Sequence, residues 1–262
     1  MAEPRHYHYA IARRADLHGQ ADGFDARPIA PIDGADRGLF SVDIGELALI
    51  VSETTDDDIL ATRRNMLAHT RALEEIMGRG PILPFRFGIV AAPGEGAARA
   101  IASRESDLSR QLKALEGRYE MGVRITWNEK AAMNAVVADE PSLRAAYERL
   151  QGRSETETHY ERIELGRRVH DALSLRRASD ADRFERELAG KALDWRRHET
   201  NDDFTVLSAA CLVDAEAERA VSGALDALDA AASDVYAIKV VAPAPPFNFV
   251  DIDLGAPSAA AA

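Results

Sequence analysis

The sequence has 262 residues, of which 29% are charged and 46% are hydrophobic. These values are ordinary for a globular protein with room for one large domain or two smaller ones. The net charge of −12 argues against a nucleic-acid partner, because a phosphate backbone binds clustered Lys and Arg. No stretch approaches the ~20 apolar residues that cross a bilayer, and the N-terminus lacks a signal-peptide pattern. We therefore expect a cytoplasmic protein with no membrane partner.

The first half of the chain predicts antiparallel strands and two helices. Apolar and polar residues alternate in its first strand with a period of two, and Gly and Asp mark the turns. The expected elements are a strand over residues 6–13, a proline-marked edge strand over 28–32, a hairpin over 38–42 and 46–52, a helix over 59–77 with its cap and acidic first turn at 55–58, a buried strand over 81–90, and a helix from Gly94 to Gly117.

The second half predicts a regular order of elements. From Tyr119 onward the order is strand, helices, strand, strand, helix, strand, which is the ferredoxin-like β-α-β-β-α-β order with an enlarged first crossover. The expected elements are a strand over residues 119–127, helices over 130–138, 142–150, 155–175 and 180–189, strands over 192–198 and 204–213, a helix capped by Asp214, and a strand over 235–242.

These elements predict an α+β protein with two domains and a tail. Residues 1–117 form a mixed α+β domain, and residues 118–242 form the ferredoxin-like domain. The tail, residues 243–262, could dock the stretch 243–254 on the body of the protein or serve as a disordered binding peptide, and the phenylalanines Phe247 and Phe249 favour docking. The alanine-rich end, 255–262, is expected to be disordered.

The sequence contains no complete motif for catalysis, cofactor binding or metal binding. The glycines at 94 and 96 lack the rest of a nucleotide-binding fingerprint, and no serine-hydrolase elbow, zinc helix or kinase motif set occurs. His6 and His8 share one strand face, but with no nearby third ligand we interpret them as an exposed polar face. The sole cysteine, Cys211, lies in an apolar run typical of an inert core thiol. We predict no catalytic, cofactor-binding or metal-binding residues.

Arg86 is the anomaly of the chain, because it stands between two phenylalanines in the predicted buried strand. Burying a guanidinium is costly unless it is paired and hydrogen-bonded. The structural interpretation pairs Arg86 with a buried carboxylate, for which Glu120 at the start of the next strand is the preferred partner. The functional interpretation makes Arg86 part of a partner-binding surface.

Three segments together resemble the signature stretches of the gas vesicle protein F/L family. They are LPFRFG at residues 83–88, YEMGVR at 119–124 and PAPPFNFV at 243–250. Their order and spacing match, and the resemblance spans essentially the whole chain. It implies two α+β domains, the second ferredoxin-like, with the tail folded back on the first.

The resemblance also implies a function. Members of this family are non-enzymatic accessory proteins of gas vesicle assembly, associated with the small hydrophobic wall protein and with other assembly factors. Strand edges at residues 28–32, at 39–52 and in the first strand are candidate sites for the wall protein. The alternative is a small-molecule-binding protein or enzyme on a ferredoxin-like scaffold, since this fold carries many functions. A third possibility is an interaction module of unrelated purpose.

Overall fold

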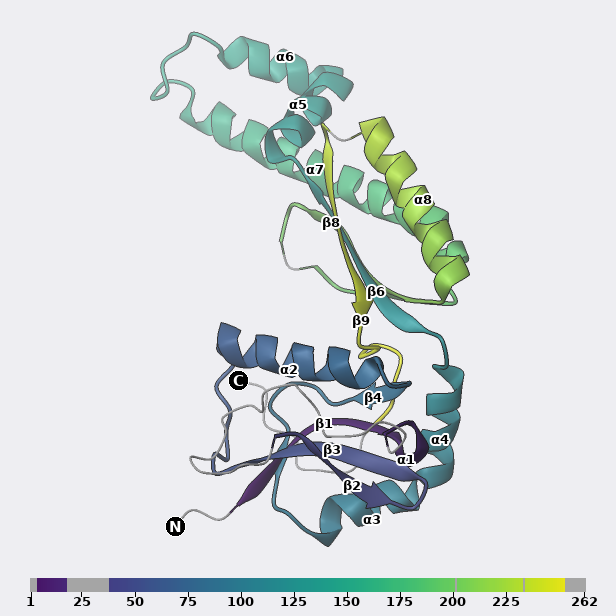
Figure 1. Cartoon of the computed structure of the whole chain (residues 1–262). Coiled ribbons are helices and arrows are strands. Elements are labelled where there is room, and N and C mark those ends of the chain that lie inside the picture. Colours follow the sequence, from purple (N-terminus) through teal and green to yellow (C-terminus); the bar gives the residue numbers. More distant parts are fainter. Residues whose placement is uncertain (1–3, 18–37, 201, 233, 253–262) are drawn as a thin grey trace. The chain divides into compact units, whose positions relative to one another are not determined.

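A computed structural model describes residues 4–17, 38–200, 202–232 and 234–252 (Figure 1). It is a mixed α+β structure, which confirms the predicted fold class. The chain forms two compact units, one of residues up to Glu120 together with the chain from Pro243 onward, the other of Met121–Ala242. The expected edge strand at 28–32 and the expected disorder at 255–262 lie outside the described residues.

The sheet of the first unit is built around its first strand. Its order is β2-β3-β1-β4, and β5 also pairs with β1. All printed pairings of β1 are antiparallel, and its register with β3 shifts between His8 and Ala10. The strands are β1 (Arg5–Arg13), β2 (Phe40–Ile44), β3 (Leu47–Thr54), β4 (Ile82–Pro84) and β5 (Val90–Ala91). Because β1 is paired on both sides, it offers no open edge to a partner strand.

The predicted hairpin is confirmed, and β2 pairs antiparallel with β3. Its turn favours a glycine at position 45. Gly45 has φ +60°, a conformation that residues with a Cβ adopt at a cost. A Cβ there would also collide with the Glu105 carboxylate, which accepts a hydrogen bond of 2.7 Å from the Glu46 N–H.

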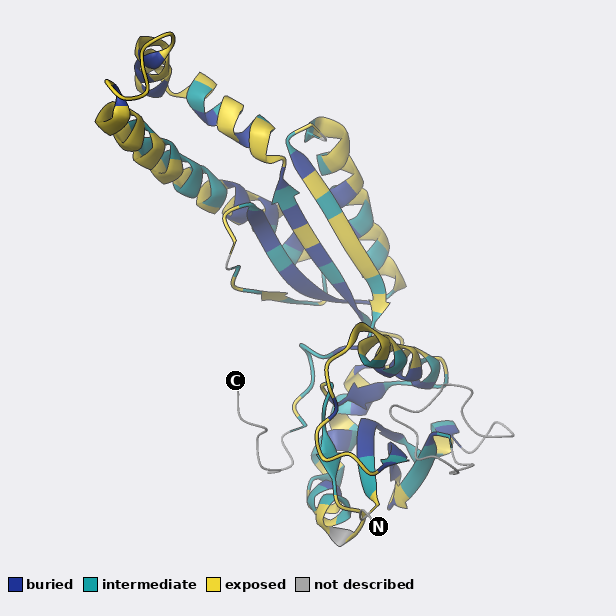
Figure 2. Cartoon of the chain, turned by 90° about the vertical axis from the view of Figure 1, so that its left-hand side faces the viewer, coloured by how far each residue is buried: buried dark blue, intermediate teal, exposed yellow. Residues whose placement is uncertain are grey.

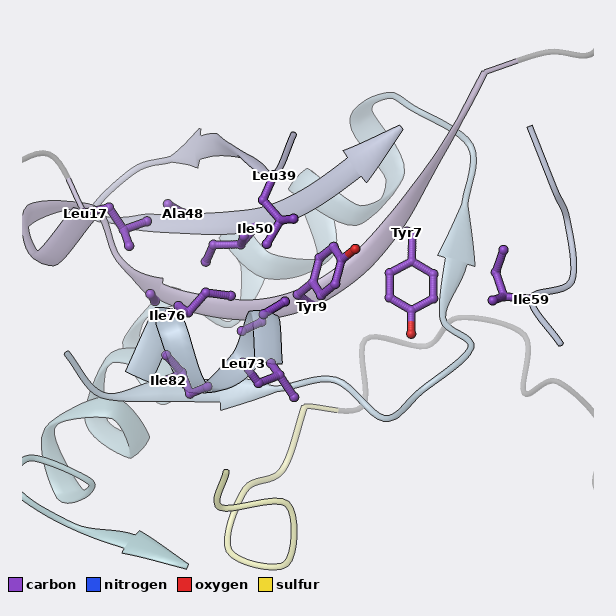
Figure 3. Packing of buried hydrophobic residues seen from close by; sticks show 13 residues of the cluster. Tyr7, Tyr9, Leu17, Leu39, Ala48, Ile50, Ile59, Leu73, Ile76 and Ile82 are labelled. Carbon is purple, nitrogen blue, oxygen red and sulfur yellow. The ribbon is translucent and has the colours of Figure 1, made fainter. Parts of the chain in front are cut away.

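The core of the first unit lies between the sheet and helix α2 (Arg63–Met77) (Figure 3). Leu73 and Ile76 of α2 are fully buried, and each such side chain contributes about 1.5–3 kcal/mol. Helices α3 (Glu95–Ser103) and α4 (Glu105–Ala114) lie on the other side of the sheet (Figure 1). A short helix, α1 (Arg14–Leu17), follows β1.

Three elements in the first unit differ from the prediction. The expected helix from Gly94 to Gly117 is two helices, α3 and α4, separated at Arg104. Helix α2 begins four residues later than expected, because Thr62 is its N-cap and accepts a hydrogen bond of 3.2 Å from the Asn65 N–H. The acidic residues at 56–58 therefore precede the helix rather than forming its first turn. The expected strand over 81–90 is also wrong as a single element, since only its ends, β4 and β5, pair with β1.

The second unit has a four-stranded sheet with the order β7-β8-β6-β9. Helices α7 and α8 contact each other and β8, and α5 and α6 contact α7. Buried residues concentrate in the two central strands of this sheet, β6 and β8, and the outward helix faces are exposed (Figure 2). The elements are β6 (Tyr119–Trp127), α5 (Glu129–Asp139), α6 (Pro141–Leu150), α7 (His159–Leu188), the 3₁₀ turn η1 (Ala189–Lys191), β7 (Asp194–Arg197), β8 (Thr205–Val213), α8 (Ala215–Ala232) and β9 (Tyr236–Ala244).

Two of the helices predicted in the second unit form a single helix in the structure. The predicted helices over 155–175 and 180–189 are one continuous helix, α7, because no Gly or Pro interrupts the stretch between them. The predicted cap of α8 is correct. The Asp214 carboxylate accepts hydrogen bonds from the N–H groups of Glu216 and Ala217 at 3.0 and 2.9 Å, which satisfies donors at the start of the helix.

Candidate functional site

The most specific constellation in the described structure is the place where the chain's end docks on the first unit. We call it the tail-docking site and define it by residues from β1, α2, the loop between β4 and β5, the start of β6, and the tail. Its members are Tyr7, His69, Phe85, Phe87, Glu120, Phe247 and Asn248. Three of the sequence segments that stood out in the chain meet here.

A buried hydrogen-bond chain ties three elements together. The Gly88 N–H donates to the Tyr7 hydroxyl at 3.1 Å, and that hydroxyl lies 3.0 Å from His69 Nδ1. His69 Nε2 lies 3.2 Å from the Phe85 carbonyl oxygen. Since a carbonyl can only accept, Nε2 carries the proton and Nδ1 accepts from Tyr7. Both ring nitrogens of neutral His69 are therefore occupied.

Burial determines the protonation of this chain. Burial lowers the pKa of His69 to about 4, because a low-dielectric environment disfavours the charged imidazolium. Burial likewise raises the pKa of the Tyr7 phenol well above its ordinary value. Both groups are therefore neutral near pH 7, and their hydrogen bonds serve to position the backbone of residues 85–88.

Aromatic rings extend this chain to the tail. The His69 ring lies edge-on to Phe87 with centroids 5.7 Å apart and is nearly parallel to Phe247 at 6.4 Å. Phe247 is partly buried against the core cluster of the first unit. The adjoining prolines, Pro245 and Pro246, are buried. The tail therefore closes one side of this core.

Glu120 holds the tail by polar contacts. Its carboxylate accepts hydrogen bonds from the Asn248 backbone N–H at 3.0 Å and from the Asn248 side-chain amide at 2.7 Å. Glu120 is only 7% exposed. Hydrogen bonds to a charged acceptor are stronger than neutral ones, so this pair specifies where the turn after Pro246 sits.

A second polar contact follows three residues later. The Gln111 side-chain amide, on α4, donates to the Asp251 carbonyl at 2.9 Å and accepts from the Asp251 N–H at 2.8 Å. Arg104 donates to the same carbonyl at 3.1 Å. This arrangement satisfies the backbone of the tail much as a neighbouring strand would.

The structure separates the two residues expected to form an ion pair. Arg86 lies in the loop between β4 and β5 and is exposed, so the premise of a buried guanidinium is wrong. The carboxylate expected to pair with it, Glu120, binds Asn248 instead. Of the two tail phenylalanines, Phe247 contacts the core, and Phe249 is partly buried with its N–H bonded to the Pro246 carbonyl at 3.1 Å.

Sequence reasoning missed Tyr7, His69 and Asn248. A signal for His69 was present, because Ala72, Leu73 and Ile76 follow it at i+3, i+4 and i+7, which places all four on one helix face. That face is buried. Asn248 had no comparable signal, since only the folded chain brings it to Glu120.

Other parts of the described structure are weaker candidates for a functional site. Within the described ranges, no group of three or more His, Cys, Asp or Glu side chains lies close enough to hold a metal ion. Burial lowers the pKa of His8 to about 4, and His8 is 4% exposed, so the expected exposed histidine face is wrong for it. Cys211 is buried in β8, as expected. No helix in the described parts has the length and apolar character to cross a membrane.

One groove lies in the second unit. It has a volume of about 760 Å³ and lies among α5, α6 and α7. Apolar side chains such as Met133, Val137 and Tyr147 line most of it, with Lys130 and Arg144 among its polar residues. It brings together no histidine or cysteine, so it offers none of the usual nucleophile–base pairs.

Comparisons with known proteins match almost the entire chain. The model of the family described as gas vesicle synthesis protein GvpL/GvpF matches residues 5–251. Gas vesicle protein F of Streptomyces sp. (strain CB03234) is 30% identical over 79% of this chain and 85% of its own length. Gas vesicle protein F of Dolichospermum flosaquae is 25% identical over 85% of this chain and 91% of its own length.

Solved structures share the fold. The crystal structure of gas vesicle protein GvpF from Anabaena sp. PCC7120 superposes with a TM-score of 0.71 at 23% identity, covering 95% of this chain and 97% of that one. The structure of GvpF from Microcystis aeruginosa gives a TM-score of 0.68 at 23% identity, with 95% and 99% covered. At this identity the likeness establishes the fold alone.

Proposed function

The chain belongs to the gas vesicle synthesis protein GvpL/GvpF family, and we propose that it is a non-enzymatic accessory protein of gas vesicle formation. In this proposal it works in the cytoplasm and at the gas vesicle, and it binds the small hydrophobic wall protein and other assembly factors. The observation that carries the proposal is the family match over residues 5–251. The tail-docking site supports it, because its parts position chain segments rather than reacting groups.

The proposed partner needs a soluble companion for a physical reason. A wall protein that polymerises through apolar surface must be shielded or oriented before assembly. The described residues leave β2 at one end of the first sheet, and such an edge can add a partner strand. We therefore keep the hairpin of β2 and β3 as the proposed contact for the wall protein.

We also propose that the second unit is a ferredoxin-like domain. Its strand order, β7-β8-β6-β9, is that of a β-α-β-β-α-β domain, with α5 and α6 as additions to the first crossover. We propose domain boundaries near residues 117 and 242, and a tail from 243 that belongs to the first domain. These divisions differ by a few residues from the compact units.

Two experiments test the functional proposal. Deleting the gene in its own host should abolish gas vesicles, seen as loss of pressure-sensitive turbidity, and a plasmid copy should restore them. Tagged wild-type protein should co-purify with the wall protein, and Ser41→Lys with Val42→Lys on β2 should reduce the recovered wall protein. Failure of the wild type to bring down any gas vesicle component would contradict the proposed partners.

The alternative, a small-molecule-binding protein, has one observation in its favour, the groove of about 760 Å³. A compound that stabilises the second unit on binding, and loses that effect in Met133→Trp, would support it. The groove contains no histidine or cysteine, so it lacks the usual nucleophile–base pairs.

A further inference from the structure

Helix α2 begins with the wrong charge for a helix. Helices α4, α5, α7 and α8 each carry at least one acidic residue in the first turn, where it interacts favourably with the positive end of the helix dipole. The first turn of α2, like that of α6, has none, and α2 begins with Arg63 and Arg64.

The arginines surround an exposed apolar side chain. Leu67 has Arg63 four residues before it, Arg64 three before it, and Arg71 four after it. Residues three and four apart lie on one helix face. Leu67 is 46% exposed, and two further apolar side chains, Leu60 and Met66, are 72% and 44% exposed. We call these six residues the Arg–Leu face.

The charges of this face are not neutralised by the part of the chain that the structure describes. None of its three arginines is within ion-pairing distance of a described carboxylate. Of the acidic residues on either side, Asp57 pairs with Arg5 and Glu75 pairs with Arg79. Glu74, three residues after Arg71, is exposed. The face thus combines an apolar centre with an unpaired cationic rim on a chain whose net charge is −12.

We propose that the Arg–Leu face binds an amphipathic segment of an assembly partner, with apolar anchors flanked by Asp or Glu. The anchors cover Leu60, Met66 and Leu67, and the carboxylates pair with the guanidinium groups, which bind carboxylates in a bidentate geometry. This inference rests on the proposed function and names the chemistry of one of its partners. Charge complementarity at the rim would fix the orientation and exclude basic segments.

Other anionic surfaces fit the face less well. Single-stranded nucleic acid is bound through aromatic side chains on which bases stack, and the six residues of the face include none. An anionic membrane is bound by an amphipathic helix whose apolar face enters the lipid, whereas the main apolar face of α2 is buried in the core.

The test uses the full chain and two labelled synthetic peptides. Both peptides are short amphipathic helices with a leucine stripe, flanked by glutamates in one and by lysines in its twin. Fluorescence anisotropy should show that the wild type binds the glutamate peptide at least about tenfold more tightly. The triple variant Arg63→Glu, Arg64→Glu, Arg71→Glu should reverse this preference, and Leu67→Ser should weaken binding of the glutamate peptide.

A matched control keeps the same total charge change. Arg149→Glu, Arg186→Glu and Arg219→Glu alter three exposed arginines of the second unit and should leave the preference unchanged. Equal effects of the two triple variants, or no preference in the wild type, would overturn the inference. Tighter binding to vesicles of phosphatidylserine and phosphatidylcholine than to the glutamate peptide would also overturn it, in favour of a lipid surface.

Co-purification separates this inference from the proposed function. If the wild type and the α2 triple variant recover gas vesicle components equally well, the function stands and the Arg–Leu face is refuted. If the wild type recovers none, the proposed function fails, whatever the peptides show. Circular dichroism of each variant confirms that α2 still folds.

Discussion

The Glu120 carboxylate binds Asn248 twice, once through the backbone N–H and once through the side-chain amide, across a sequence separation of 128 residues. Glu120 is the last residue of the first unit before the chain leaves it, and Asn248 follows its return at Pro243. The pair therefore fixes the returning chain to the end of the departing one.

Loss of this carboxylate should loosen the tail. We expect Glu120→Ala to destabilise the first unit by about 1–3 kcal/mol, because it leaves the Asn248 donors without a partner. Hydrogen exchange of β1 and α2 peptides measures the effect. Trp127 and Trp195 both belong to the second unit, so their fluorescence should stay unchanged and serves as an internal control. Equal exchange in wild type and variant would contradict the proposed anchor.

A double-mutant cycle can assign the effect to the pair. If Glu120 acts through Asn248, the variants Glu120→Ala and Asn248→Ala together should cost less than the sum of their separate effects, with a coupling of about 0.5–3 kcal/mol. Glu74→Ala changes an exposed acid of α2 and should stay within about 0.5 kcal/mol of the wild type. Simple additivity of the two site variants would show that they act independently.

Phe247→Ala should weaken the core that the tail closes. A fully buried Phe→Ala change costs about 3–5 kcal/mol. Phe247 is only partly buried, so we expect about 1–2 kcal/mol, read as faster exchange in the α2 segment around His69. Leu175→Ala removes a side chain that is 74% exposed and should have little effect. A similar small effect of Phe247→Ala would mean that the ring contributes no packing.

Stability should fall on acidification below about pH 6.5. The pKa values of His8 and His69 are lowered by burial to about 4, against 6.5 in an unfolded chain. Between these values the unfolded state binds more protons, so stability is full above pH 6.5 and is lost as the pH falls towards 4. Each histidine accounts for at most about 3 kcal/mol.

Hydrogen exchange of the first unit at pH 7 and pH 4.5, corrected for intrinsic rates, should show this loss of stability. His69→Gln should reduce the difference between the two pH values, and an unchanged difference would exclude His69 as a contributor.

Arg86→Ala should be nearly neutral for stability, within about 0.5 kcal/mol, because the side chain is exposed. The neighbouring change Phe85→Ala should cost about 3–5 kcal/mol, since Phe85 is 6% exposed. Hydrogen exchange of β1 compares the two variants within one motif. A large loss of stability in Arg86→Ala would instead support the hypothesis of a buried, ion-paired Arg86.

Local patterns predicted the elements well where one physical signal dominated. The strand β1, the hairpin at Gly45 and the cap at Asp214 each depend on residues within a few positions, and each is confirmed. The expected exposed face of β1 is not, because its residues from Tyr7 to Ala12 are all buried. The start of α2 was misplaced because two plausible caps compete, the acidic run at 56–58 and Thr62. Thr62 is the cap in the structure, and Ile59 is buried in the core cluster instead of lying on the helix.

The sequence by itself determined the family, the α+β class and the segments that matter, because these are properties of local pattern and motif order. It could not decide how those segments meet. The exposed position of Arg86, the burial of His69 and the partner of Glu120 depend on contacts between residues far apart in the chain. The identity of a side chain alone does not indicate which distant group will hydrogen-bond to it when it is buried and charged. That partner is determined only by the tertiary structure, which brings Asn248 to Glu120.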